Sequence, residues 1–134
     1  MTKDEHIKYW IKGAEDDLSA AESLFNAEKY NGCLFIAHLV LEKMLKALFI
    51  LRNDNKIPHK THNLLKLAEK SGLKLTEERQ IFLDEVNSFN LESRYPDYKN
   101  TFYKKCDKEF TENYFVKIKE YIKWLTYLIE SEKP

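Results

Sequence analysis

The chain has 134 residues, 43% of them hydrophobic, and only 3 glycines and 3 prolines. This length predicts one domain with a single core, spanning residues 1–134. The scarcity of turn residues excludes a sandwich or a barrel and favours long helices with few connections. The 22 basic and 22 acidic residues give zero formal net charge, which argues against non-specific nucleic-acid binding over the whole surface.

Cysteine usage and the N-terminal residues indicate a cytoplasmic protein. Cys33 and Cys106 show no metal-ligand spacing, and nothing at the N-terminus resembles a signal peptide. The most apolar run, residues 33–51, includes His38 and Glu42, which a lipid-facing span does not tolerate cheaply. We therefore expect two free thiols, no membrane association and a buried core helix.

Apolar residues at helical intervals predict two long helices in the first half. Thr2 and Glu5 have the spacing of a capping box, and an apolar stripe over residues 7–25 follows them. Asn31 is a suitable N-cap for the second helix. The stripe of this second helix, residues 33–49, is broad enough to predict contacts on two sides and a central position.

Three further helices are expected in the second half. Thr61 is expected to cap a short third helix, which Gly72 ends in the left-handed conformation. Thr76 starts a fourth helix, and a final helix is expected from about residue 107 or 111 to residue 130. Five helices with short connections predict an all-α, up-and-down bundle.

Residues 92–98, with the sequence Glu-Ser-Arg-Tyr-Pro-Asp-Tyr, separate the two helical halves. Because Pro96 disfavours the α region for the residue before it, Tyr95 should be extended and a helix should end upstream. Arg94 is therefore expected at a helix end or in a loop. Such connections carry function more often than helix interiors do, so Arg94 is the first candidate for a site.

The side chains of this segment suit an anionic, aromatic ligand. The planar guanidinium of Arg94 fits a phosphate or a carboxylate, and Tyr95 and Tyr98 can stack on a base. In the alternative interpretation, Arg94 pairs with Glu92 or Asp97 and the tyrosines pack at a subunit contact. The residues alone leave both interpretations open.

Lysines downstream of Arg94 extend this candidate surface. They are Lys99, Lys104, Lys105 and Lys108, and only Asp107 offsets them within that stretch. A basic surface here suits a phosphate backbone or a nucleotide. The alternative is a solvated face without a ligand.

His38, Glu42 and Lys46 interrupt the apolar second helix at successive turns. Glu42 and Lys46 have the favourable order for a surface pair four residues apart, and the three side chains are candidates for one wall of a groove. The alternative for His38 is a hydrogen-bonded structural histidine. The histidines have no metal-ligand spacing, and no glycine-rich phosphate loop occurs, so neither a metal nor a cofactor is expected.

Four stretches together resemble the HEPN family of small helical domains, named for nucleotide binding in higher eukaryotes and prokaryotes. They are Tyr9-Trp10 with residues 14–18, residues 37–48, residues 58–64 and residues 93–97. The resemblance covers nearly the whole chain. Within the family, the chain is similar to the small prokaryotic type that serves as substrate-binding subunit of a nucleotidyltransferase. It implies a helical bundle that forms a homodimer, with the arginine segments of both subunits near a shared cleft.

Many HEPN relatives are RNases whose arginine is followed shortly downstream by a histidine. This sequence departs from that pattern, because no histidine follows His62. Asn100 stands at a compatible distance from Arg94, but an amide does not act as a general base near neutral pH. The departure weakens an RNase assignment and leaves phosphate binding by Arg94 intact.

Other relatives pair with a minimal nucleotidyltransferase, as a subunit or as the toxin of a toxin-antitoxin module, and often carry the Arg-Tyr-Pro-Asp form. Some such toxins are silenced by modification of a tyrosine just after the arginine, the neighbourhood of Tyr98. We expect a nucleotide- or RNA-phosphate-binding homodimer with such a partner. The alternatives are a metal-independent RNase toxin using Arg94 with Asn100 or His38, and a non-catalytic interaction module. The candidate ligand-binding residues are Arg94, Tyr95, Asp97, Tyr98, Lys99, Asn100, His38, Glu42 and Lys46.

Overall fold

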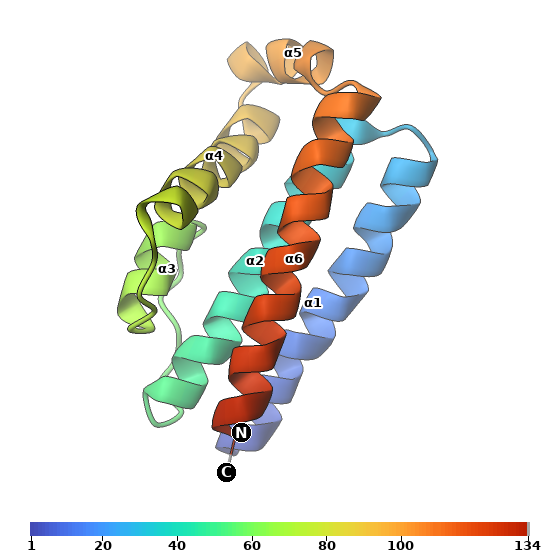
Figure 1. The fold of residues 1–134 in the computed structure, drawn as a ribbon. Helices are drawn as coiled ribbons and strands as arrows, with labels where there is room; N and C mark the ends of the chain where they lie inside the picture. The colour runs from blue at the N-terminus through green and yellow to red at the C-terminus, as the bar shows by residue number, and fades with distance from the viewer. Residues whose placement is uncertain (134) are drawn as a thin grey trace.

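The computed structural model describes residues 1–133, without the side chains of residues 96–99, and this part of the chain forms six helices. The helices are α1 (Lys3–Asn26), α2 (Tyr30–Arg52), α3 (Leu64–Lys70), α4 (Glu77–Arg94), α5 (Pro96–Lys105) and α6 (Lys108–Glu132). Long helices run alternately up and down in chain order, with α5 crossing one end (Figure 1). The all-α bundle is confirmed, with one helix more than the five predicted.

The first two helices form an antiparallel hairpin (Figure 1). The predicted capping box is present: the Glu5 N–H donates to Thr2 Oγ1 at 3.2 Å, and the Thr2 N–H donates to Glu5 Oε1 at 3.0 Å. The predicted cap at Asn31 is wrong. Helix α2 already begins at Tyr30, and Lys29, at its cap position, makes no side-chain hydrogen bond. The start of α2 is held by backbone hydrogen bonds instead of a side-chain cap: the Lys29 N–H donates to the Leu24 carbonyl, and the Cys33 N–H donates to the Lys29 carbonyl.

Helix α2 is the centre of the bundle, as its broad apolar stripe predicts. It contacts α1 and α6, and also α3 and α4, so most of its residues from Cys33 onward are buried. The C-terminal ends of α2 and α6 are joined by Arg52, whose guanidinium donates to both carboxylate oxygens of Glu132 at 2.9 and 2.7 Å. Within residues 1–133, no helix combines the length and apolar character that a membrane crossing requires.

Helix α3 is short and capped at both ends. Its N-cap is Asn63, whose side-chain oxygen accepts from the N–H groups of Leu65 and Lys66 at 3.0 and 3.2 Å. The predicted cap at Thr61 is therefore wrong, because its hydroxyl accepts from the Asn63 N–H one step earlier. Gly72 ends the helix with φ +69°, as predicted.

Helix α5 was not expected from the sequence. Among its described side chains, only Phe102 is buried, and the next buried residue, Cys106, follows the end of the helix. The ten-residue segment therefore lacks the repeated apolar stripe that marks the longer helices. Pro96 at its first turn is favourable, because proline supplies a helical φ and the absent N–H needs no partner there. Asp107 then caps α6, accepting from the Phe110 N–H at 2.8 Å, within the predicted start of the last helix.

Candidate functional site

Arg94 is the last residue of α4 and is exposed to solvent. Tyr95 leaves the helix in an extended conformation, with φ −104° and ψ 126°, as the proline after it predicts, and 51% of its surface is exposed. Helix α5 starts at the next residue. The segment is therefore a tight junction between two helices that presents Arg94 at one end of the bundle (Figure 1).

Basic side chains outnumber acidic ones in the stretch that begins at Arg94. Residues 94–108 hold five basic and two acidic side chains, a net charge of +3 in a chain whose total is zero. Lys104, Lys105 and Lys108 are exposed, and the ammonium of Lys105 lies 5.3 Å from the ring centre of Phe110. Asp107 is occupied as the cap of α6. The stretch from Arg94 to Lys108 is therefore positive, and Glu92, Glu109 and Glu112 border it with negative charge.

Asn100 is exposed on α5, in reach of solvent. The side chains of Asp97, Tyr98 and Lys99 lie outside the described residues, so their roles stay predictions. Glu92, the upstream candidate for pairing with Arg94, forms no ion pair with Arg94 among the described atoms. Burial raises the pKa of the Cys106 thiol to about 12, and the negative charge of Glu92 adds to this effect.

His38, Glu42 and Lys46 form a second group, buried inside the bundle. The predicted surface pair of Glu42 and Lys46 is wrong in its location, because only 5% and 8% of these residues is exposed. Lys46 Nζ donates to Glu42 Oε2 at 3.0 Å and lies 5.0 Å from the ring centre of Trp10. Helices pack against α2 on both sides, so they bury a face of α2 that its sequence periodicity predicts to be exposed to solvent.

His62, which the sequence did not indicate as part of this group, completes the surroundings of Glu42. Its Nδ1 lies 2.7 Å from Glu42 Oε1, and its carbonyl oxygen lies 2.8 Å from Nε2 of His38. His38 has no exposed surface, and burial lowers its pKa, so the neutral imidazole is favoured. His38 is thus the hydrogen-bonded structural histidine of the alternative interpretation, and it has no direct access to a dissolved phosphate.

Asn87 links the start of α3 to α4. Its side-chain oxygen accepts from the Leu64 N–H at 2.8 Å, and its amide donates to Asn63 Oδ1 at 3.0 Å. Arg94 follows seven residues later on nearly the same helix face, about 10 Å further along the axis. Asn87 and Arg94 thus lie on one side of α4, but no hydrogen bond or ion pair joins Arg94 to the buried group among the described residues.

Residues 7–129 match the HEPN domain family. The chain belongs to the HEPN family. This match covers both the buried group on α2 and the Arg94 junction, so the resemblance seen in the sequence is confirmed. A comparison with curated proteins finds no match.

The fold is shared with a solved structure, the crystal structure of TT1696 from Thermus thermophilus. The two chains superpose with a TM-score of 0.74 over 95% of this chain and 98% of the other, at 16% sequence identity. At this identity the likeness concerns the HEPN fold alone. It shows that nearly the whole chain shares the fold of that protein.

In this HEPN domain the arginine position and the histidines are separated. Arg94 ends α4, whereas His38 is buried and about half of the His62 side chain is covered next to Glu42. Among the described residues no cluster of His, Cys, Asp or Glu suits a metal ion. The exposed groups at the arginine end include a guanidinium, ammonium groups, an amide and tyrosines, which are suited to binding anions and stacking on bases, together with the carboxylates of Asp107 and Glu109.

Proposed function

We propose that this HEPN domain binds the phosphate of a nucleotide or of RNA through Arg94. The observation that carries the proposal is the exposed guanidinium at the junction of α4 and α5, within the part of the chain where positive charge is concentrated. A guanidinium forms paired, charge-assisted hydrogen bonds with phosphate oxygens. The first turn of α5 adds the partial positive charge of a helix N-terminus, close to Arg94 in the chain.

Exposed apolar and aromatic side chains around Arg94 support base stacking and self-association. Leu91, Tyr95 and Tyr103 are 49%, 51% and 65% exposed. Tyrosine rings stack on nucleobases without sequence preference, and aromatic residues are enriched at interface centres. The proposal includes a homodimer that brings two arginine junctions together, and a minimal nucleotidyltransferase as partner in a toxin-antitoxin-like module.

Binding of nucleotides and short RNA to wild type, Arg94→Ala and Lys74→Ala tests the role of Arg94. Lys74 is the matched control, because it is an exposed cation beyond the opposite end of α4. Loss of a charge-assisted contact should weaken binding about tenfold to a hundredfold in Arg94→Ala. Lys74→Ala should bind as wild type does. Equal affinities of all three proteins would remove Arg94 from the site.

The RNase alternative is tested in the same samples. Arg94 and Asn100 are exposed, but an amide offers no general base, and His38 is inside the bundle. We therefore expect RNA to remain intact after prolonged incubation with the wild-type protein. Cleavage that Arg94→Ala abolishes would instead support an RNase. Gel filtration with and without a nucleotidyltransferase encoded by a neighbouring gene tests the partner.

A further inference from the structure

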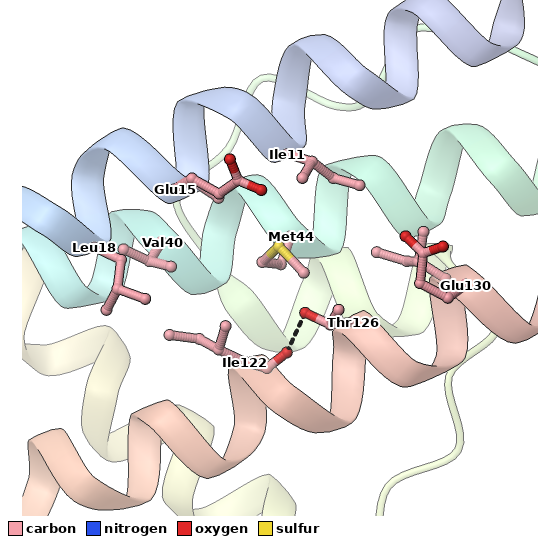
Figure 2. Close-up of a pocket in the computed structure, with 10 residues that line it drawn as sticks. Ile11, Glu15, Leu18, Val40, Met44, Ile122, Thr126 and Glu130 are labelled. Atoms are coloured by element: carbon pink, nitrogen blue, oxygen red, sulfur yellow. Dashed lines mark hydrogen bonds between the residues drawn. The ribbon is translucent and has the colours of Figure 1, made fainter.

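An apolar hollow of about 120 Å³ opens between α1 and α6, away from the Arg94 junction (Figure 2). Val40 and Met44 of α2 form its floor, and Ile11, Leu18 and Ile122 form its walls. The floor residues are buried, whereas the wall residues are only partly covered. A cavity of about 150 Å³ accommodates a benzene molecule, so this hollow has room for one branched aliphatic side chain.

Two exposed carboxylates stand at the rim of this hollow. Glu15 belongs to α1 and Glu130 to α6 (Figure 2). Among the described residues Glu15 has no ion pair, and the one contact of Glu130 is a distant one, 3.8 Å to Nζ of Lys133. The hollow therefore suits an apolar side chain that carries positive charges on both sides.

Ile57, in the loop between α2 and α3, is an apolar side chain of that kind. It is the most exposed large hydrophobic residue in the described part of the chain, at 80%. Lys56 and Lys60 flank it and are exposed, and neither forms an ion pair with a described residue. Its size and charge surroundings complement those of the hollow.

The loop holds Ile57 in a fixed position. The next residue, Pro58, is buried, and the ring of His59 packs edge-on against Phe49 with centres 5.7 Å apart. On the other side, the amide of Asn55 donates to the carbonyl of Met1 at 3.0 Å. A side chain presented on an ordered loop loses less conformational freedom on binding than one on a mobile segment.

We propose that a second copy of this chain inserts Ile57 into the hollow between α1 and α6, with Lys56 and Lys60 facing Glu15 and Glu130. Insertion removes the apolar surface of Ile57 from water, and the four charges select the partner and its orientation. The contact uses none of the residues at the Arg94 junction, so it is independent of the proposed phosphate site. Because the surface involved is small, the contact is weak and exchanging.

Single-cysteine variants trap such a contact covalently. Both natural cysteines are buried with pKa values raised to about 12, so an introduced exposed cysteine reacts in preference to them. Asp54→Cys, on the same loop as Ile57, and Thr126→Cys, at the mouth of the hollow, are mixed and treated with a short bifunctional maleimide, so that Ile57 itself is kept. We expect a covalent dimer containing one of each variant.

The control replaces Thr126→Cys by Val116→Cys, which places an exposed cysteine on the other half of α6. Cross-linking of Asp54→Cys to Thr126→Cys at least tenfold above this control supports the proposal. Cross-linking less than tenfold above the control, or none in either mixture, overturns it.

A charge exchange tests the role of the four ionic side chains. Glu15→Lys with Glu130→Lys, added to the Thr126→Cys variant, should abolish its cross-linking to Asp54→Cys. Lys56→Glu with Lys60→Glu, added to Asp54→Cys, should restore cross-linking to that reversed variant. Failure of the doubly exchanged pair to recover would overturn the complementarity of the two surfaces. Neither result depends on whether Arg94 binds phosphate.

Discussion

Charged side chains of the same type occupy two different environments in this chain. Lys46 and Glu42 are buried on α2, and Lys12 and Asp16, also four residues apart, are more than half exposed on α1. In water a pair of this kind contributes little, because solvent already stabilises each charge. Inside the bundle, removing one partner leaves the other charge without compensation.

Glu42→Ala should lower the free energy of unfolding by about 3 kcal/mol, because it leaves Lys46 buried without a counter-charge. His62 loses its carboxylate partner in the same variant. Asp16→Ala, the matched control at an exposed pair, should leave stability nearly unchanged. Urea unfolding at neutral pH measures both. A similar small change in the two variants would show that Lys46 reaches water when Glu42 is absent.

The sequence predicted the placement of Arg94 but not the burial of Glu42. A proline acts on the residue just before it, so Tyr95 and the end of α4 are readable locally. Burial of Glu42 depends on the loop that brings His62 to α2, twenty residues away in sequence. Asn87 was missed for the same reason, since it acts through hydrogen bonds to residues more than twenty positions away, whereas Asn63 caps α3 through local hydrogen bonds.

Helix ends in this fold depend on backbone conformation as much as on side-chain caps. Gly72 ends α3 with φ +69°, a conformation that strains any residue with a Cβ atom, although the space around it is open. Gly32, in the first turn of α2, has ordinary helical geometry, and an added Cβ would meet the Leu24 side chain at 3.6 Å. Two glycines of one chain thus have opposite requirements.

The same substitution should change stability in opposite directions at these two glycines. Gly72→Ala should destabilise the fold by about 1 kcal/mol, because alanine is strained at positive φ. Gly32→Ala should stabilise it by about 0.5 kcal/mol, because alanine favours the helix and the contact with Leu24 is an ordinary one. Thermal and urea unfolding measure both variants. Equal effects would mean that the end of α3 relaxes to another conformation.

Periodicity located the helices that bury a continuous stripe and missed α5. The long helices repeat apolar residues over several turns, whereas α5 fixes itself to the bundle mainly through Phe102, whose ring lies 5.4 Å from that of Phe89. A single buried residue does not create the helical repeat of apolar residues by which a helix is recognised in the sequence. Sequence analysis therefore predicted the architecture and the position of Arg94, but not the helix that follows it.

At the scale of the molecule, the core is continuous around α2. Cys33 lies near the start of this helix, and Cys106 lies between α5 and α6, so both thiols lie in the same end of the core, where the charge of a Cys33 thiolate would add to the burial that raises the pKa of Cys106. Burial raises the pKa of each to about 12. Neither thiol is accessible or ionised at neutral or mildly alkaline pH while the bundle is folded.

Thiol labelling should therefore report opening of the core at the α5 end of the bundle. At pH ~8.5 a thiol reagent should modify both cysteines rapidly in denaturant, and at least about a hundredfold more slowly in the native protein. The less stable Glu42→Ala variant should label faster than wild type under native conditions. Fast labelling of Cys106 alone in wild type would instead indicate that α5 and its junction open separately from the core.

The two described chain ends lie together at the end of the bundle opposite α5 (Figure 1), where Arg52 joins the ends of α2 and α6. A tag or fluorophore attached to either end therefore stays far from Arg94, so ligand titrations can use labelled protein. A tag at either end would also lie near the loop that carries Ile57, so the cross-linking experiments require an untagged chain. The geometry also permits a short peptide to join the ends, as circular permutation requires.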